Sequence, residues 1–180
     1  MLKVVVIVLS LAYPFMVYWG LQHYDARILL PVLAMLLGLR WLAGSKTSER
    51  KIIIATLIGI IIIAFIWGNQ LGLKFYPVMM NLGFLILFGS SLISPPTVVE
   101  RLARLQDPDL PSHAVVYTRK VTVVWSVFFL VNGSIAAFTA LFSTEKIWMF
   151  YNGFIAYILI GILAAGEWLI RQRVKASFSK

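Results

Sequence analysis

Residues 121–142 read VTVVWSVFFLVNGSIAAFTALF, and this stretch decides the fold of the chain. It contains no acidic or basic residue over a length close to the roughly 20 residues that a helix needs to cross a bilayer. Inside hydrocarbon, a helix satisfies all of its backbone hydrogen bonds within its own segment. The stretch therefore predicts a membrane-spanning α-helix.

Five further stretches are apolar over similar lengths, although 28–43 is short and carries Arg40 near its end. We expect an all-α, polytopic transmembrane helix bundle of about six spans, forming a single domain over 1–180. A re-entrant second segment would leave five spans and put the two termini on opposite sides. The predicted spans are 4–21, 28–43, 52–68, 75–93, 121–142 and 147–170.

The composition supports lipid as the solvent of this chain. Of the 180 residues, 61% are hydrophobic and 13% are charged, whereas a soluble domain is roughly 45–50% apolar and 25% charged. The chain has no cysteine, which excludes disulfides, thiolate metal sites and a cysteine nucleophile. His23 and His113 are predicted on opposite sides of the membrane, so we expect no metal and no cofactor.

The basic residues fall mostly on one side of the predicted spans. The formal net charge is +9, and positive residues mark cytoplasmic loops. Both termini are therefore predicted in the cytoplasm, and the same asymmetry favours six spans over five. We read these charges as topology signals and contacts to anionic membrane lipids, with no nucleic acid as a partner. The cytoplasmic set is Lys3, Arg40, Lys46, Arg50, Lys51, Arg101, Arg104, Arg119, Lys120, Arg171, Arg173, Lys175 and Lys180, and the outer set is Arg27, Lys74 and Lys146.

One connection, the cytoplasmic loop 94–120, is long. Thr97 followed by Glu100 forms a capping box, which predicts the start of a short helix. Val98, Leu102 and Leu105 would share one face of this helix, which fits the headgroup layer. The loop is either an interfacial connector or a docking surface. The candidates for partner docking are Glu100, Arg101, Arg104, Asp107, Asp109, Arg119 and Lys120.

A second group of candidates is polar and lies within the spans. Asn81, Asn132 and Asn152 are each followed closely by glycine. Asn81 and Asn152 lie at similar predicted depths, so they could face each other. Interhelical hydrogen bonding is one interpretation, and a ligand-lined cavity is the other. The intramembrane candidates are Tyr76, Asn81, Asn132, Tyr151 and Asn152.

No ionisable side chain is predicted deep in a span. Glu167 lies near the cytoplasmic end of the last span, and its spacing from Arg171 predicts an ion pair along the helix. The lack of a deep carboxylate or histidine weakens the case for a proton-coupled pump.

Several stretches resemble a known family. They are FYPVMMNLGF at 75–84, PPTVVERLAR at 95–104, YTR at 117–119 and YNG at 151–153. Over roughly residues 74–170 the chain is similar to a small polytopic bacterial inner-membrane family of unknown function, encoded in clusters for aryl-polyene and fatty-acid-like biosynthesis. The resemblance implies a multi-pass protein of the inner membrane. It carries over no catalytic residue.

Three functions follow for testing. The first is an accessory protein for lipid or aryl-polyene assembly that docks an acyl carrier protein or a synthase at its basic cytoplasmic face. The second is a transporter or flippase of a lipid-linked product, which would work as a homo-oligomer. The third is an intramembrane acyltransferase that would use Glu100, Asp107 and Asp109. No serine or histidine constellation supports that enzyme.

Overall fold

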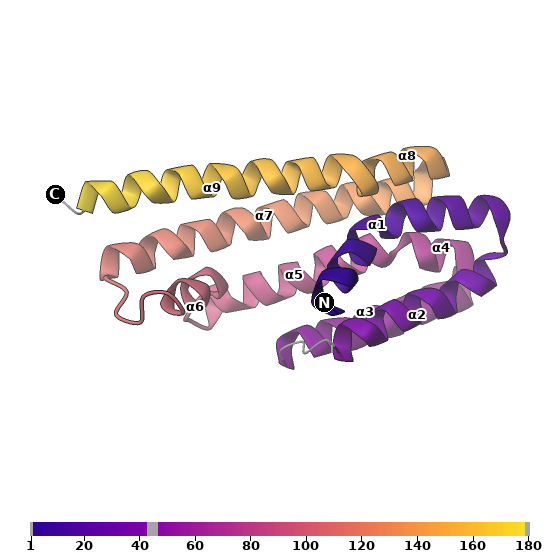
Figure 1. Ribbon diagram of the computed structural model, residues 1–180, viewed down its shortest axis with the longest axis horizontal. Helices are drawn as coiled ribbons and strands as arrows, with labels where there is room; N and C mark the ends of the chain where they lie inside the picture. The colour runs from indigo at the N-terminus through magenta and orange to yellow at the C-terminus, as the bar shows by residue number, and fades with distance from the viewer. Residues whose placement is uncertain (1, 43–46, 179–180) are drawn as a thin grey trace.

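The structure is a computed structural model that describes residues 2–42 and 47–178. Over these ranges all regular secondary structure is helical and there is no strand. The helices form an elongated bundle (Figure 1). In chain order they are α1 (Leu2–His23), α2 (Ala26–Leu42), α3 (Thr47–Trp67), α4 (Asn69–Lys74), α5 (Tyr76–Ile93), α6 (Val98–Arg104), α7 (Ser112–Phe142), α8 (Glu145–Phe150), the π-helix η1 (Tyr151–Ile155) and α9 (Ala156–Phe178).

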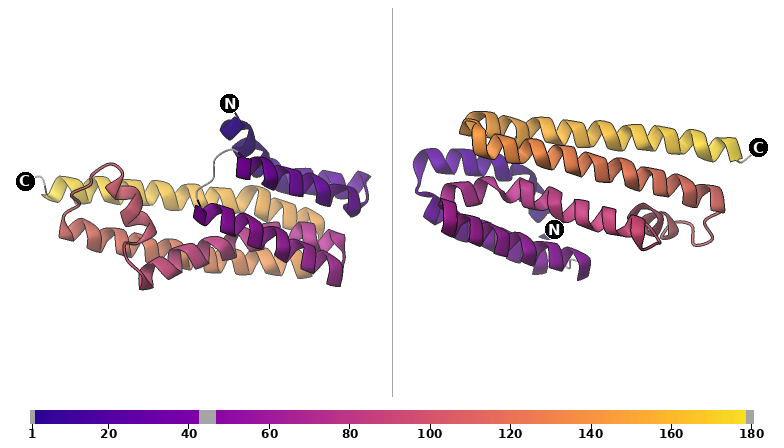
Figure 2. Two further views of the ribbon diagram at one scale, coloured as in Figure 1. Left: turned by 90° about the horizontal axis from the view of Figure 1, so that it is seen from below. Right: turned by 180° about the vertical axis from the view of Figure 1, so that it is seen from behind.

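The two ends of the bundle differ, and we name each after the short helix that it carries. The α6 end holds α6, the start of α7 and the end of α9, on the left of Figure 1. The α8 end holds α8, α4 and the turn between α1 and α2. The start of α1 lies partway along the bundle, as both views of Figure 2 show.

Helices occupy all six segments that the sequence predicts as spans, although residue 43 of the second segment lies outside the described residues. Within the described part of the chain, three helices are long and apolar enough to cross a membrane. These are α5, α7 and the continuous helix Glu145–Val174, and α3 is apolar over the shorter range Ile53–Trp67. The expectation of an all-α chain with membrane-spanning helices is confirmed at this level.

The fourth predicted span was expected to begin at Phe75, whereas the structure already has helix from Asn69, in α4. A single residue, Gly68, separates α3 from α4, and its φ of 99° is one that glycine adopts readily. Only Phe75 separates α4 from α5. Lys74, which the charge count places in an outer loop, therefore lies in a helix and is only 7% exposed.

The core at the α8 end forms around a proline. Pro77 has no backbone N–H, so the carbonyl of Leu73, four residues earlier, loses its helical partner. The Tyr13 hydroxyl of α1 donates to that carbonyl at 2.9 Å. The Trp148 indole of α8 donates to the next carbonyl, Lys74 O, at 3.1 Å. Leu73 and Trp148 are fully buried, so three helices meet where the α4–α5 ladder is broken.

Close approach between α3 and α4 depends on Gly72. A Cβ at this position would lie 2.8 Å from Ala64 Cβ and 3.1 Å from the backbone oxygen of Ile60. The second contact is with backbone, which cannot move aside as a flexible side chain can. Gly161 of α9 offers a matched control, because a Cβ there would meet nothing within 4 Å.

We predict that Gly72→Ala destabilises the protein by about 1–3 kcal/mol through overpacking. Gly161→Ala should be neutral, or stabilising by up to about 1 kcal/mol, since alanine favours a helix interior. Thermal unfolding in detergent, followed by the loss of helical circular dichroism, measures both variants. Equal midpoints would show that the α3–α4 contact is not tight.

Candidate functional site

Three of the intramembrane candidates form one chain of hydrogen bonds across three helices. The Tyr151 hydroxyl donates to Asn132 Oδ1 at 2.9 Å. Asn132 Nδ2 donates to Asn81 Oδ1 at 3.0 Å, and Asn81 Nδ2 donates to Pro77 O at 2.8 Å. Asn132 and Tyr151 are buried and Asn81 is half-buried. The chain therefore links η1, α7 and α5 through side chains that each hold a partner.

Gly133 allows this chain to form. A Cβ at Gly133 would lie 3.0 Å from Asn81 Cβ, so a side chain there would press against α5 at the point where the two asparagines meet. Small residues at helix contacts let backbones approach closely enough for polar side chains to bond across them. The Asn132–Gly133 pair is the sequence signal for this contact.

Asn152 has different partners. Its Nδ2 donates to Thr139 Oγ1 at 3.2 Å and to Trp148 O at 2.9 Å. It also lies in η1, where Ala156 N–H reaches back five residues to Tyr151 O. A π-turn disturbs the ordinary ladder, and the Asn152 amide supplies a bond to one carbonyl beside it.

The expectation that Asn81 and Asn152 face each other is wrong. Asn81 lies twelve residues after the start of α4 at Asn69, or ~18 Å along the helix, and Asn152 lies seven residues after Glu145, or ~10 Å. They are therefore at different depths. The sequence placed the start of the fourth span at Phe75, whereas α4 begins at Asn69, so the position of Asn81 along the bundle was misjudged.

The fifth intramembrane candidate, Tyr76, is buried against Tyr13, and the ring centroids are 4.4 Å apart. In the described part of the chain, no buried side-chain nitrogen or oxygen lacks a hydrogen-bond partner. The intramembrane candidates bond mainly to one another and to nearby backbone. This geometry is that of interhelical bonding.

At the α6 end, the predicted helix start is confirmed. Thr97 Oγ1 accepts from the backbone N–H of Glu100 at 3.3 Å, as an N-cap residue does. The Glu100 side chain, however, pairs with Arg104 one turn later, with N–O distances of 2.9 and 3.0 Å. Glu100 is 6% exposed, so this ion pair is partly shielded from water.

Three arginines of the predicted docking set also support the backbone around them. Arg101 Nε donates to Pro96 O at 2.8 Å, and Arg104 donates to Pro108 O at 3.0 Å. Arg119 of α7 donates to Leu92 O at 3.0 Å, a carbonyl in the last turn of α5. Carbonyls at a helix C-terminus lack intrahelical partners and carry partial negative charge. Arg119 therefore ties α7 to the end of α5, whereas Arg101 and Arg104 hold the backbone on either side of α6.

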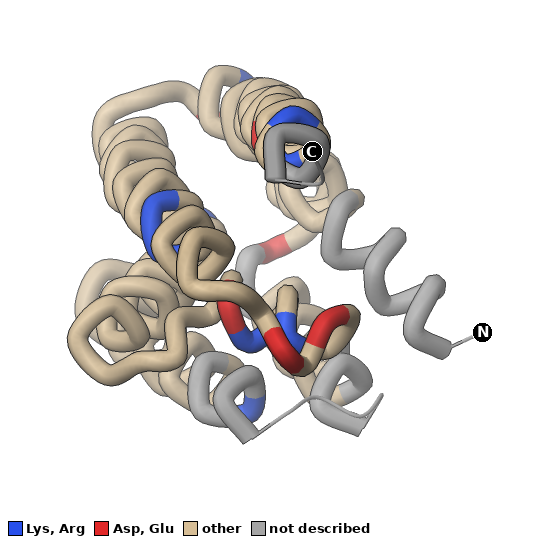
Figure 3. Tube along the Cα trace, turned by 90° about the vertical axis from the view of Figure 1, so that its left-hand side faces the viewer, with Lys and Arg blue, Asp and Glu red and all other residues tan. Residues whose placement is uncertain are grey.

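The orientation of α6 differs from that of an amphipathic helix on a soluble protein. Glu100 is turned inward, while Leu102 is 52% exposed and Leu105 is 73% exposed. Arg101, Arg119 and Lys120 are also exposed at this end. We call Arg101, Leu102, Leu105, Arg119 and Lys120 the α6 surface. Figure 3 looks onto this end and shows basic and acidic positions gathered there; Asp107 and Asp109 are exposed in the segment that follows α6.

The sequence reasoning missed the contacts that hold α9 to this end. Arg171 donates to Gln106 Oε1 at 3.1 Å, and the Tyr117 hydroxyl donates to the backbone oxygen of Glu167 at 3.3 Å. The expected ion pair between Glu167 and Arg171 is not formed. Each of the two finds a partner on another segment, which spacing along one helix does not reveal.

A polar contact at the α8 end was also missed. The Glu145 carboxylate accepts from Gln22 Nε2 of α1 at 2.8 Å and from Gln70 Nε2 of α4. Glu145 is the first residue of α8, where a negative charge is favourable. The single carboxylate therefore joins three helices. In the sequence, the only sign of this contact is that polar residues lie near the ends of three helices that are far apart along the chain.

The chain matches no protein-family model, no curated protein and no solved structure. A functional assignment therefore rests on the geometry of the α6 surface and of the hydrogen-bond chain through Asn81, Asn132 and Tyr151.

We predict that Asn132→Ala costs about 1–3 kcal/mol, because it leaves Asn81 Oδ1 and the Tyr151 hydroxyl without their partner. A double-mutant cycle with Tyr151→Phe should give a coupling energy of about 0.5–2 kcal/mol. Ser134→Ala is the control, since Ser134 is exposed and bonds only to Leu130 O of its own helix. Unfolding in detergent measures all four variants, and a coupling energy near zero would contradict the hydrogen-bond chain.

Proposed function

We propose that this chain is a multi-pass protein of the bacterial inner membrane, with six spans and both termini in the cytoplasm. We further propose that it docks an acidic partner, an acyl carrier protein or a synthase that carries one, during lipid or aryl-polyene assembly. The observation that carries this proposal is the α6 surface. It combines exposed positive charge with exposed leucine on an end that the charge count assigns to the cytoplasm.

The arginine contacts do not remove this charge. Arg101 and Arg119 donate to backbone carbonyls, which are neutral, so both guanidinium groups keep their full positive charge. Lys120 is exposed and has a compact ammonium group. Arg104 differs, because its charge is offset by Glu100. The electrostatic attraction for an acidic partner therefore rests on Arg101, Arg119 and Lys120.

The exposed leucines give the surface a second component. Protein interfaces combine an apolar centre with a polar rim, and electrostatics contributes more to association rate and specificity than to affinity. Leu102 follows Arg101 on α6, and Leu105 is the residue at the C-cap of the same helix. An acidic carrier that presents an apolar patch would satisfy both components. Membrane lipid is the competing occupant of this surface, and the binding experiment below separates the two.

The transporter alternative needs a cavity lined by the asparagines and tyrosines of the spans. In the structure these side chains bond to one another and to nearby backbone and hydroxyl groups. The acyltransferase alternative needs a carboxylate activated by a neighbouring group. Glu100 is held by Arg104, while Asp107 and Asp109 are exposed. Neither alternative has a specific geometric observation in its favour.

We predict that Lys120→Glu raises the Kd for the host's acyl carrier protein about tenfold, which corresponds to ~1.4 kcal/mol. Adding Arg101→Glu should weaken binding further, and raising the salt concentration should weaken binding to the wild type. Lys146→Glu, at the α8 end, is the matched control and should bind normally. Interferometry with the protein in lipid nanodiscs measures each affinity.

Two outcomes of that binding experiment would contradict docking at the α6 surface. One is equal affinity for all variants. The other is no carrier binding together with increased retention of anionic lipid by the wild type, which would assign the surface to the membrane.

The predicted topology can be tested with single cysteine substitutions. The chain has no cysteine of its own, so each labelled thiol is the introduced one. A maleimide that cannot cross membranes should label Lys146→Cys in intact spheroplasts. It should label Asp109→Cys and Lys3→Cys only after permeabilisation. Labelling of Lys3→Cys but not Asp109→Cys in intact spheroplasts would instead give five spans with the termini on opposite sides.

A further inference from the structure

An apolar groove of about 380 Å³ runs between α1 and α2 at the α8 end of the bundle. Its inner wall is made by the buried side chains of Tyr13, Val17 and Leu33. Its mouth carries Ile28, Val32 and Trp19, which are 58%, 36% and 57% exposed. The groove is thus closed by the core on one side and open to the surroundings of the bundle on the other.

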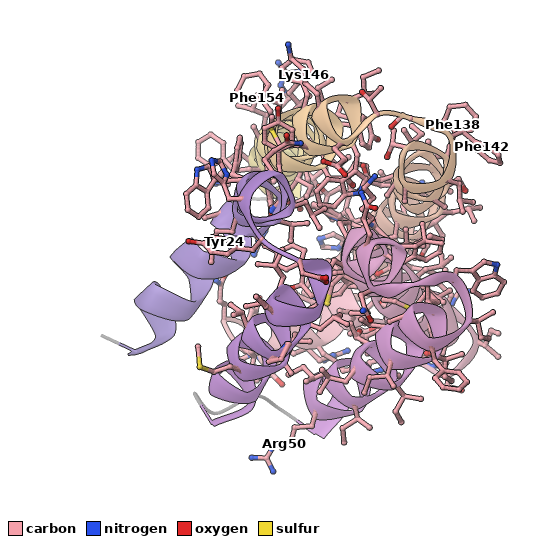
Figure 4. The ribbon with its side chains drawn as sticks, turned by 90° about the vertical axis from the view of Figure 1, so that its right-hand side faces the viewer. Tyr24, Arg50, Phe138, Phe142, Lys146 and Phe154 are labelled. Atoms are coloured by element: carbon pink, nitrogen blue, oxygen red, sulfur yellow. The ribbon has the colours of Figure 1, made fainter. Side chains whose placement is uncertain are left out.

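The polar atoms around the groove are engaged elsewhere or lie at its edge. The Tyr13 hydroxyl donates to Leu73 O, so Tyr13 offers its ring to the groove. At the edge, Trp19 stacks on His23 at 4.6 Å and lies 5.8 Å from Tyr24. Figure 4 shows Tyr24 extending outward at this end of α1 and α2. Aromatic residues with one polar atom favour the boundary between hydrocarbon and headgroups.

The dimensions of the groove match one lipid leaflet. From Tyr13 to the end of α1 at His23 the helix advances ten residues, or ~15 Å. This length is half of the roughly 30 Å hydrocarbon core of a bilayer. The aromatic edge marks one limit of that length, and Tyr13 marks the other.

We propose that this groove binds one hydrocarbon chain of a membrane phospholipid, in the leaflet that the α8 end faces. The inference rests on the proposed placement of α1 and α2 within the membrane. The chemistry of recognition is apolar along the groove, and the aromatic edge of Trp19 and Tyr24 sets the level at which the chain joins its headgroup. The site is separate from the α6 surface, which lies at the opposite end of the bundle.

The groove is small beside a helix, whose diameter with side chains is at least ~10 Å. A helix from a second copy would therefore cover the mouth of the groove. A single extended hydrocarbon chain is the narrow apolar occupant that a membrane supplies.

Native mass spectrometry of the full chain, extracted in mild detergent, tests this proposal. The wild type should retain one phospholipid per chain, and Val32→Trp, which fills the mouth, should lower that occupancy about tenfold. Val127→Trp on α7 is the matched control, because Val127 is also lipid-accessible at 54% exposure and lies outside the groove. It should retain the lipid as the wild type does.

Three results would overturn the proposal. They are a wild type that retains no lipid, equal retention by the two tryptophan variants, and a wild-type dimer that Val32→Trp separates. Because α6-surface binding is measured with Lys120 variants, and the cysteine labelling tests the spans, failure of the groove is distinguishable from failure of the proposed function.

If Val32→Trp does not fold, a second measurement tests whether the groove binds a phospholipid chain. Phospholipids brominated on their acyl chains quench nearby tryptophan fluorescence, and the difference between wild type and Trp19→Phe isolates Trp19. Quenching of Trp19 should saturate at about one brominated lipid per chain, as a single site requires. Trp168 of α9, 56% exposed and outside the groove, should be quenched in proportion to the lipid fraction. Proportional quenching of both would show that no specific site exists.

Discussion

The carbonyl of Leu73, which Pro77 deprives of the N–H four residues on, is the constraint on which the packing at the α8 end depends. Leaving a buried carbonyl without a well-formed hydrogen bond costs about 1–3 kcal/mol, and Leu73 is fully buried. Tyr13 supplies the missing bond from α1, and Trp148 supplies a bond to the next carbonyl from α8. Each donor comes from another helix, so satisfying the backbone of α4 also brings α1 and α8 into place.

The same requirement explains the polar side chains deeper in the bundle. The π-turn at Tyr151 disturbs the backbone ladder of the last helix, and Asn152 bonds to Trp148 O beside it. Asn132 joins Asn81 to Tyr151, so each of these amides and hydroxyls is occupied. These groups therefore bond mainly to other helices and to nearby backbone. The α6 surface, in contrast, is exposed at one end of the bundle.

Hydropathy predicted where the helices lie, because runs of apolar residues in membranes have few alternatives to helix. The capping box predicted α6, because it is a local signal. The partner of Asn81 could not be predicted, since it depends on α4, whose residues 69–74 look like a polar loop by composition. The spacing of Glu100 and Arg104 is a local signal for their ion pair, whereas the burial of Glu100 depends on how α6 packs on α7 and was missed. Local sequence patterns predict where a helix begins and ends. The contacts between side chains of different helices depend on how those helices are aligned, which the sequence of one segment does not show.

Tyr13 connects the constraint at Pro77 to the groove between α1 and α2. Its hydroxyl holds Leu73 O, while its ring forms part of the groove wall and contacts Tyr76. A hydrocarbon chain in the groove would therefore pack against the residue that fastens α1 to the rest of the bundle. Tyr76 is the first residue of α5, the helix that carries Asn81. Tyr13 therefore links the wall of the groove to the start of that helix.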